Sequence, residues 1–110
     1  MGEDWQPITR NDFDELLALQ TAALSSQSRE HFERYRVEPF KAIIRRSEQY
    51  GDESVWVVAR ADMIVVFFDD VEYEFAVGRI DDCRILFDGY MGDLTDAMYG
   101  FPDNWGPQTR

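Results

Sequence analysis

Four carboxylates are interleaved with apolar side chains in the stretch FFDDVEYEF, residues 67–75. Acidic residues at this density could serve as acid–base catalysts, as oxygen ligands of a divalent ion, or as a surface that binds a cationic partner. They could also form the solvated side of an ordinary strand. The choice depends on which carboxylates the fold brings together. Those in this stretch are Asp69, Asp70, Glu72 and Glu74.

Catalysis is the least favoured of these roles. A pair of carboxylates acts as acid and base only where a pocket excludes water from one of them. The alternation of apolar and polar residues in 71–80 instead predicts an open strand face. The seven glycines are scattered and form no phosphate-binding loop, and no nucleophile motif is present. We therefore expect neither an enzyme nor a cofactor.

A divalent-ion site would need oxygen ligands from two adjacent turns. The aspartates that could meet in this way are Asp69, Asp70, Asp81 and Asp82. Their spacing matches no calcium-binding loop. One cysteine and one histidine in the whole chain exclude both a zinc site of the usual Cys/His type and an intramolecular disulfide. We therefore predict no metal site, and we expect His31 at the surface or between helices.

The net charge of the chain is −11, and most of it lies in the second half. Residues 1–51 contain nine acids and seven bases, whereas residues 52–110 contain thirteen acids and four bases. This field disfavours nucleic acids and anionic membranes and favours a basic partner, although solubility alone would also explain it. The clustering of the acids favours binding. The predicted partner-binding residues are Asp69, Asp70, Glu72, Glu74, Asp81, Asp82, Asp88 and Tyr90.

Helical periodicity dominates the first half of the chain. A helix is predicted after a cap at Thr9 or Asn11, and one of its faces is apolar. The members of that face are Phe13, Leu16, Leu17, Gln20, Ala23 and Leu24. Because Pro39 interrupts the next helical pattern, we expect a short helix near residues 29–37 and another near 39–50, or one kinked helix.

The second half has the alternation of strands. Residues 54–60 and 63–69 predict a hairpin, and residues 71–80 and 84–88 predict two further strands joined by a turn at 81–83. Within 71–80, one set of side chains should face the helices while Glu72 and Glu74 face water. That inward set is Val71, Tyr73, Phe75 and Val77. A short helix capped by Asp93 should follow, with Leu94, Ala97, Met98 and Phe101 on one side.

These elements predict one α+β domain over residues 1–110, irregular at 1–8 and 102–110. Its N-terminal helices should pack on one face of a four-stranded antiparallel meander, and a short C-terminal helix should follow. The stretch MGEDWQPITR has no apolar run, so it is not a signal peptide. The longest apolar run, residues 63–68, is far below the ~20 residues of a membrane helix. We expect a cytoplasmic protein.

Residues 55–101 resemble bacterial immunity proteins of polymorphic-toxin and contact-dependent growth inhibition systems. The resemblance consists of a hairpin, the acidic strand DDVEYEF, the turn GRIDD, the strand ILFDGY and the closing helix DLTDAM. It covers less than half of the chain. It implies a small acidic cytoplasmic domain that binds a cognate toxin domain, often a nuclease, and blocks its active site or an adjacent surface. The alternatives are an acidic regulatory or adaptor domain with another protein partner, and a small enzyme.

Overall fold

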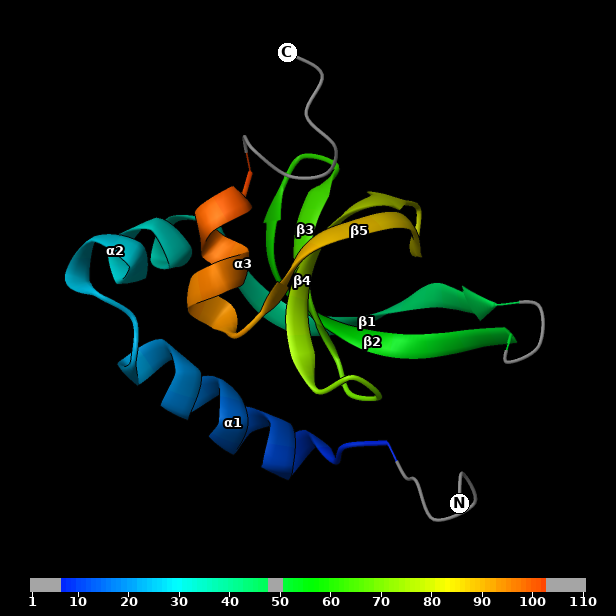
Figure 1. Cartoon of the computed structure of the whole chain (residues 1–110), viewed down its shortest axis with the longest axis horizontal. Helices are drawn as coiled ribbons and strands as arrows, with labels where there is room; N and C mark the ends of the chain where they lie inside the picture. The colour runs from blue at the N-terminus through cyan, green and yellow to red at the C-terminus, as the bar shows by residue number, and fades with distance from the viewer. Residues whose placement is uncertain (1–6, 48–50, 103–110) are drawn as a thin grey trace.

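The computed structural model describes residues 7–47 and 51–102, which form three helices and five strands (Figure 1). The helices gather on one side of the sheet, and the β1–β2 pair extends away from them. None of the helices in these ranges has the length and apolar character that a membrane crossing requires. In chain order the elements are α1 Arg10–Ala22, α2 Ser26–Tyr35, β1 Arg36–Ser47, β2 Gly51–Ala61, β3 Ile64–Asp69, β4 Glu74–Asp81, β5 Arg84–Gly92 and α3 Leu94–Gly100.

The five strands close into a barrel in the order β1-β2-β3-β4-β5. Consecutive strands pair antiparallel, whereas β1 pairs with β5 in parallel through Ile43 opposite Arg84 and Ile44 opposite Ile85. The α+β class and the antiparallel order of the last four strands are confirmed. The open four-stranded meander is replaced by a closed five-stranded barrel, in which closure removes the exposed edges that a meander would leave.

The additional strand, β1, occupies the segment where a helix near 39–50 was expected. That expectation is wrong, because residues 36–47 pair with β2 along most of their length. Ala42 and Ile44 are buried, whereas Ile43 between them is half-buried and Lys41 and Arg45 on either side are exposed, which fits the two-residue period of a strand. Pro39 lies where the register shifts between Arg36 and Phe40, and a bulge of this kind accommodates a proline that has no N–H to donate.

Two apolar clusters form the core, one on each side of the sheet. The helices contribute Phe13, Leu17, Phe32 and Leu94 to the first, where they pack against strand residues that include Phe75. The second consists of strand residues alone, as expected for side chains that fill a small barrel. Its buried members are Ala42, Ile44, Val55, Val57, Val65, Phe67, Ala76, Ile80 and Ile85.

Burial on both faces changes the expected assignment of residues 71–77. Phe75 and Val77 face the helices as predicted, but Ala76 faces the second cluster rather than water. Val71 and Tyr73 are exposed, because β4 begins only at Glu74 and both residues lie in the turn that precedes it. The prediction that they are core residues is therefore wrong.

The predicted caps of α1 and α3 agree with the structure, whereas the helix expected near residues 29–37 is α2, which begins at Ser26 and ends at Tyr35. Thr9 caps α1, and its hydroxyl accepts a hydrogen bond from the amide of Asp12 at 3.1 Å. Asp93 caps α3 and forms a reciprocal pair of hydrogen bonds with Asp96. One side of α3 is buried as expected, with Leu94, Ala97, Met98 and Phe101 in the core.

Candidate functional site

Asp69 and Asp70 organise the turn between β3 and β4. Both are buried. The Asp69 Oδ1 atom accepts hydrogen bonds from the backbone amides of Val71 at 3.0 Å and Glu72 at 3.2 Å. Asp70 Oδ2 accepts one from the backbone amide of Ile8 at 2.9 Å, which joins the turn to the chain that enters α1. These two carboxylates therefore stabilise the β3–β4 turn, and little of their surface is open to a partner.

The other predicted carboxylates do not all lie together. Asp69 and Asp70 lie at the end of β4 that begins with Glu74, and Asp81 and Asp82 lie at its other end, so the length of this eight-residue strand separates them. At about 3.3 Å per residue that distance is roughly 23 Å. The arrangement of the four aspartates around a divalent ion, which the sequence left possible, is therefore not formed. Within the described ranges, no group of three or more His, Cys, Asp or Glu residues is arranged to hold a metal ion.

Asp81 and Asp82 are exposed at the far end of β4, close to the β2–β3 turn that contains Asp62. Their neighbourhood contains Arg84, which pairs with Asp52 at 3.1 Å. The predicted residues Asp88 and Tyr90 lie in β5, but their side chains are outside the described residues.

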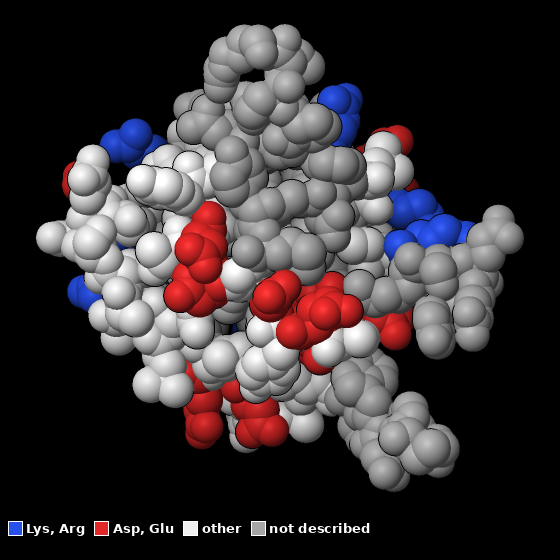
Figure 2. Space-filling model, viewed as in Figure 1, with Lys and Arg blue, Asp and Glu red and all other residues white. Residues whose placement is uncertain are grey.

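Glu74 instead lies in a hollow that is also lined by Leu16 and Gln20 of α1 and by Asp93 at the start of α3, and Glu72 lies just before it in the β3–β4 turn. Figure 2 shows acidic side chains over α1, over the end of the barrel next to α1 and beside α3, with Lys and Arg toward the edges of the view. We call this surface the acidic face. Asp12, Glu15, Glu74 and Asp93 line its two hollows together with the side chains of Leu16, Leu19 and Tyr73. The face also includes Glu72, which precedes Tyr73 in the β3–β4 turn, and Asp96, which is hydrogen-bonded to Asp93.

Two hollows cross the acidic face, and Leu16 and Tyr73 line both of them. The larger one, which we call the α1 groove, has a volume of about 660 Å³ and runs between α1 and the β3–β4 turn. Its lining is Pro7, Ile8, Thr9, Asp12, Glu15, Leu16, Leu19, Asp70 and Tyr73. The smaller one, of about 220 Å³, runs toward α3 past Gln20, Glu74 and Asp93.

Tyr73 lies at the centre of the acidic face. Its side chain is 60% exposed, and its ring stands edge-on to that of Phe68 at a centroid distance of 5.2 Å. Its backbone is left-handed, with φ of 61°, a conformation that costs a β-favouring aromatic residue roughly 1–2 kcal/mol. Strained backbone conformations cluster at functional sites, and tyrosine is enriched among the residues that contribute most to binding.

None of the six carboxylates of the acidic face forms an ion pair with a described Lys or Arg. By contrast, Arg10 forms ion pairs with both Asp14 of α1 and Glu38 of β1. Like charges that gather on one surface repel one another and attract cations. The acidic face is therefore suited to a positively charged partner.

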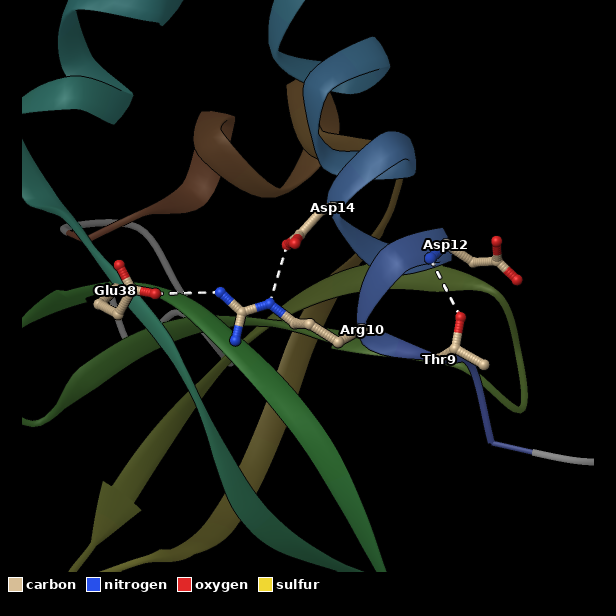
Figure 3. Close-up of polar contacts among 5 residues, drawn as sticks. All are labelled: Thr9, Arg10, Asp12, Asp14 and Glu38. Atoms are coloured by element: carbon tan, nitrogen blue, oxygen red, sulfur yellow. Dashed lines mark hydrogen bonds and ion pairs between the residues drawn. The ribbon is translucent and has the colours of Figure 1, made fainter.

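Arg10 links α1 to β1 through Asp14 and Glu38, as Figure 3 shows. Its Nε donates to Asp14 Oδ1 at 2.9 Å and its Nη2 donates to Glu38 Oε2 at 3.0 Å. These hydrogen bonds, to Asp14 first and then to Glu38, raise the pKa of Arg10 above its ordinary value, so the side chain stays charged. The guanidinium also lies 5.2 Å from the ring centroid of Trp56, on which Phe13 stacks. With this side of α1 held to the barrel, Asp12 and Glu15 line the α1 groove.

Sequence reasoning missed the contribution of α1, because Asp12 and Glu15 look like ordinary acids in the first turns of a helix. One signal was present. Asp12, Glu15 and Leu19 are spaced three and four residues apart, which places them on one helix face. The buried residues Phe13 and Leu17 lie on a different face of the helix, so Leu19 is an apolar residue outside the core.

His31 and Cys83 lie away from the acidic face. The Nε2 atom of His31 is 2.6 Å from the carbonyl oxygen of Phe101, which confirms a position between helices. Cys83 is exposed in the β4–β5 turn.

The chemistry available to the acidic face is thus the binding of cations and apolar groups. In comparisons with known proteins, no family model, curated sequence or solved structure matches the chain.

Proposed function

We propose that this protein binds a basic protein domain through the acidic face and neutralises it, acting in the cytoplasm as an immunity protein. The observation that carries the proposal is the gathering of six carboxylates, without described Lys or Arg partners, around the exposed Tyr73 and Leu19. An apolar centre with a charged rim is the usual composition of a protein–protein interface. Tyrosine is among the residues that contribute most to binding energy at such centres.

The resemblance of residues 55–101 to immunity proteins supports a toxin domain as the partner. A nuclease toxin holds phosphates with Lys and Arg, so its substrate-binding surface is basic. An acidic protein can cover that surface in place of the nucleic acid. The charges would accelerate the encounter, while the apolar centre would slow dissociation once water is excluded.

We also propose that the acidic face binds without turning over a substrate. Five of its six carboxylates are exposed, and Glu74 is half-buried. General acid–base catalysis requires a carboxylate that is held out of water and positioned against a reacting group. Carboxylates open to solvent are better suited to attracting and contacting a partner.

The test is co-expression with the toxin domain encoded by the adjacent gene. Cells that produce the toxin domain should survive only when the chain is also produced, and the two proteins should co-purify. Toxicity that persists in the presence of the folded chain, together with no complex on size-exclusion chromatography, would rule out the proposed function. A variant that loses two charges of the acidic face, by Glu15→Gln and Glu72→Gln, should protect less well than a variant with Asp81→Asn and Asp82→Asn. The two variants carry the same net charge.

A further inference from the structure

We infer that the α1 groove receives an arginine side chain from the partner, flanked by apolar residues. This inference rests on the proposed function and specifies how the acidic face recognises a basic protein. The groove has the size for a short segment rather than an ion, at about 660 Å³. Its walls are formed by α1 on one side and the β3–β4 turn on the other.

The lining of the α1 groove is apolar over much of its area. Leu16 is half-buried and Leu19 is 71% exposed, so that both leave aliphatic surface open beside the Tyr73 ring. Burying such surface against an apolar group is favourable. These side chains favour an occupant with aliphatic groups, which inorganic cations and small polar ions lack.

The charge of the α1 groove selects a cation. Asp12 and Glu15 lie one helical turn apart on α1 and both line the groove, whereas no Lys or Arg occurs among its lining residues. The occupant should therefore combine an aliphatic stem with a positive head. Arginine and lysine are the two side chains of this kind.

Tyr73 favours arginine over lysine. A guanidinium is planar, stacks on an aromatic ring and can bond two carboxylate oxygens at once, whereas an ammonium is more strongly hydrated. The chain already contains this arrangement on the other side of α1. There Arg10 lies over the Trp56 ring at 5.2 Å and bonds the carboxylates of both Asp14 and Glu38. The α1 groove offers the same set, an aromatic ring and two carboxylates, to an arginine from outside.

The α1 groove is already formed in the unbound chain, because hydrogen bonds fix both of its walls. Asp70 accepts a hydrogen bond from the amide of Ile8, two residues before α1, and Asp69 accepts hydrogen bonds from two amides of the β3–β4 turn. Arg10 holds α1 against the barrel from the other side. A preformed groove loses less conformational freedom on binding than a flexible one does.

The test uses the full chain, labelled with ¹⁵N, and a blocked nine-residue peptide that has one arginine between two leucines. Saturable shifts of the amides of Leu19 and Tyr73 are expected. A matched peptide with lysine should bind about tenfold more weakly, and one with uncharged citrulline should not bind. Equal affinity for all three peptides, or for spermine and the arginine peptide, would overturn the inference.

Matched variants identify the groove as the binding site. Tyr73→Asn removes the ring and suits the left-handed backbone, so this variant should fold and lose at least about tenfold in peptide affinity. Tyr99→Ala is the control, because Tyr99 is 85% exposed and lies outside the groove. Leu19→Ser should likewise weaken binding, whereas Leu86→Ser, at an exposed leucine on β5, should not. Equal losses within either pair would overturn the inference.

This experiment separates the inference from the proposed function. If the toxin domain binds the acidic face but the peptide leaves Leu19 and Tyr73 unchanged, the arginine site is wrong and the proposed function stands. If the peptide binds in the groove but the toxin domain does not bind the chain, the proposed function is wrong and the arginine site stands.

Discussion

Replacing Phe75 by alanine should reduce the free energy of unfolding by about 3–5 kcal/mol. Phe75 is fully buried, and its ring packs at 5.0 Å from that of Phe68 in the cluster beneath the helices. Truncation would leave a cavity where the helices meet the barrel. For a domain of this size each kcal/mol lowers the melting temperature by roughly 4 °C, so the melting temperature should fall by roughly 12–20 °C.

Replacing Tyr73 by alanine should cost much less, although Tyr73 and Phe75 are two residues apart and both contact the ring of Phe68. Tyr73 is mostly exposed, so the main loss is one edge-on aromatic contact, worth about 1 kcal/mol. Urea denaturation followed by circular dichroism measures both variants. Equal losses for Tyr73→Ala and Phe75→Ala would show that Tyr73 is a core residue and would refute the exposed turn on which the acidic face depends.

Three further predictions concern the supports of the acidic face. Asp69→Ala should cost about 1–3 kcal/mol in urea denaturation, because two amides of the turn lose their acceptor, whereas Asp69→Asn keeps Oδ1 and should cost less. Arg10→Ala should speed amide hydrogen exchange in α1, while exchange in β3 stays unchanged. Glu72→Gln should leave the unfolding midpoint unchanged, because Glu72 is exposed, and a large loss of stability would contradict its placement.

Local sequence signals predicted the helix ends and hairpins of this fold. The caps at Thr9 and Asp93 depend on side chains that bond amides within the same turn, and these interactions are visible in the sequence. Strand β1 was missed because Phe40, Ile43 and Ile44 suit either a helix or a strand. Pairing with β2 and β5 makes this segment a strand, and such long-range pairing cannot be recognised from the local sequence.

The acidic face was predicted in part. Glu72 is exposed as expected, but Glu74 is half-buried beside α1 and the start of α3 rather than on the face away from the helices, and the strict alternation assigned to residues 71–77 failed. The Asp69 carboxylate bonds the amides of the next residues, which forms a turn where the pattern suggested a strand. Asp12 and Glu15 were missed because their proximity to Tyr73 depends on how α1 packs against the barrel. The charges of a helix and of a distant turn become one site only in the folded chain.

The central claim is that the position of the carboxylates, not the net charge, attracts the partner. Surface plasmon resonance with the toxin domain should compare two triple variants that each remove three charges. One changes the acidic face by Asp12→Asn, Glu15→Gln and Glu72→Gln. The other changes the opposite end of β4 and consists of Asp62→Asn, Asp81→Asn and Asp82→Asn.

The association rate should fall about tenfold or more for the variant of the acidic face and less than about twofold for the control, with the difference shrinking as salt rises. Equal slowing of the two variants, or association of the wild-type chain that is indifferent to salt, would contradict the account and leave the acidic face as a solubilising surface.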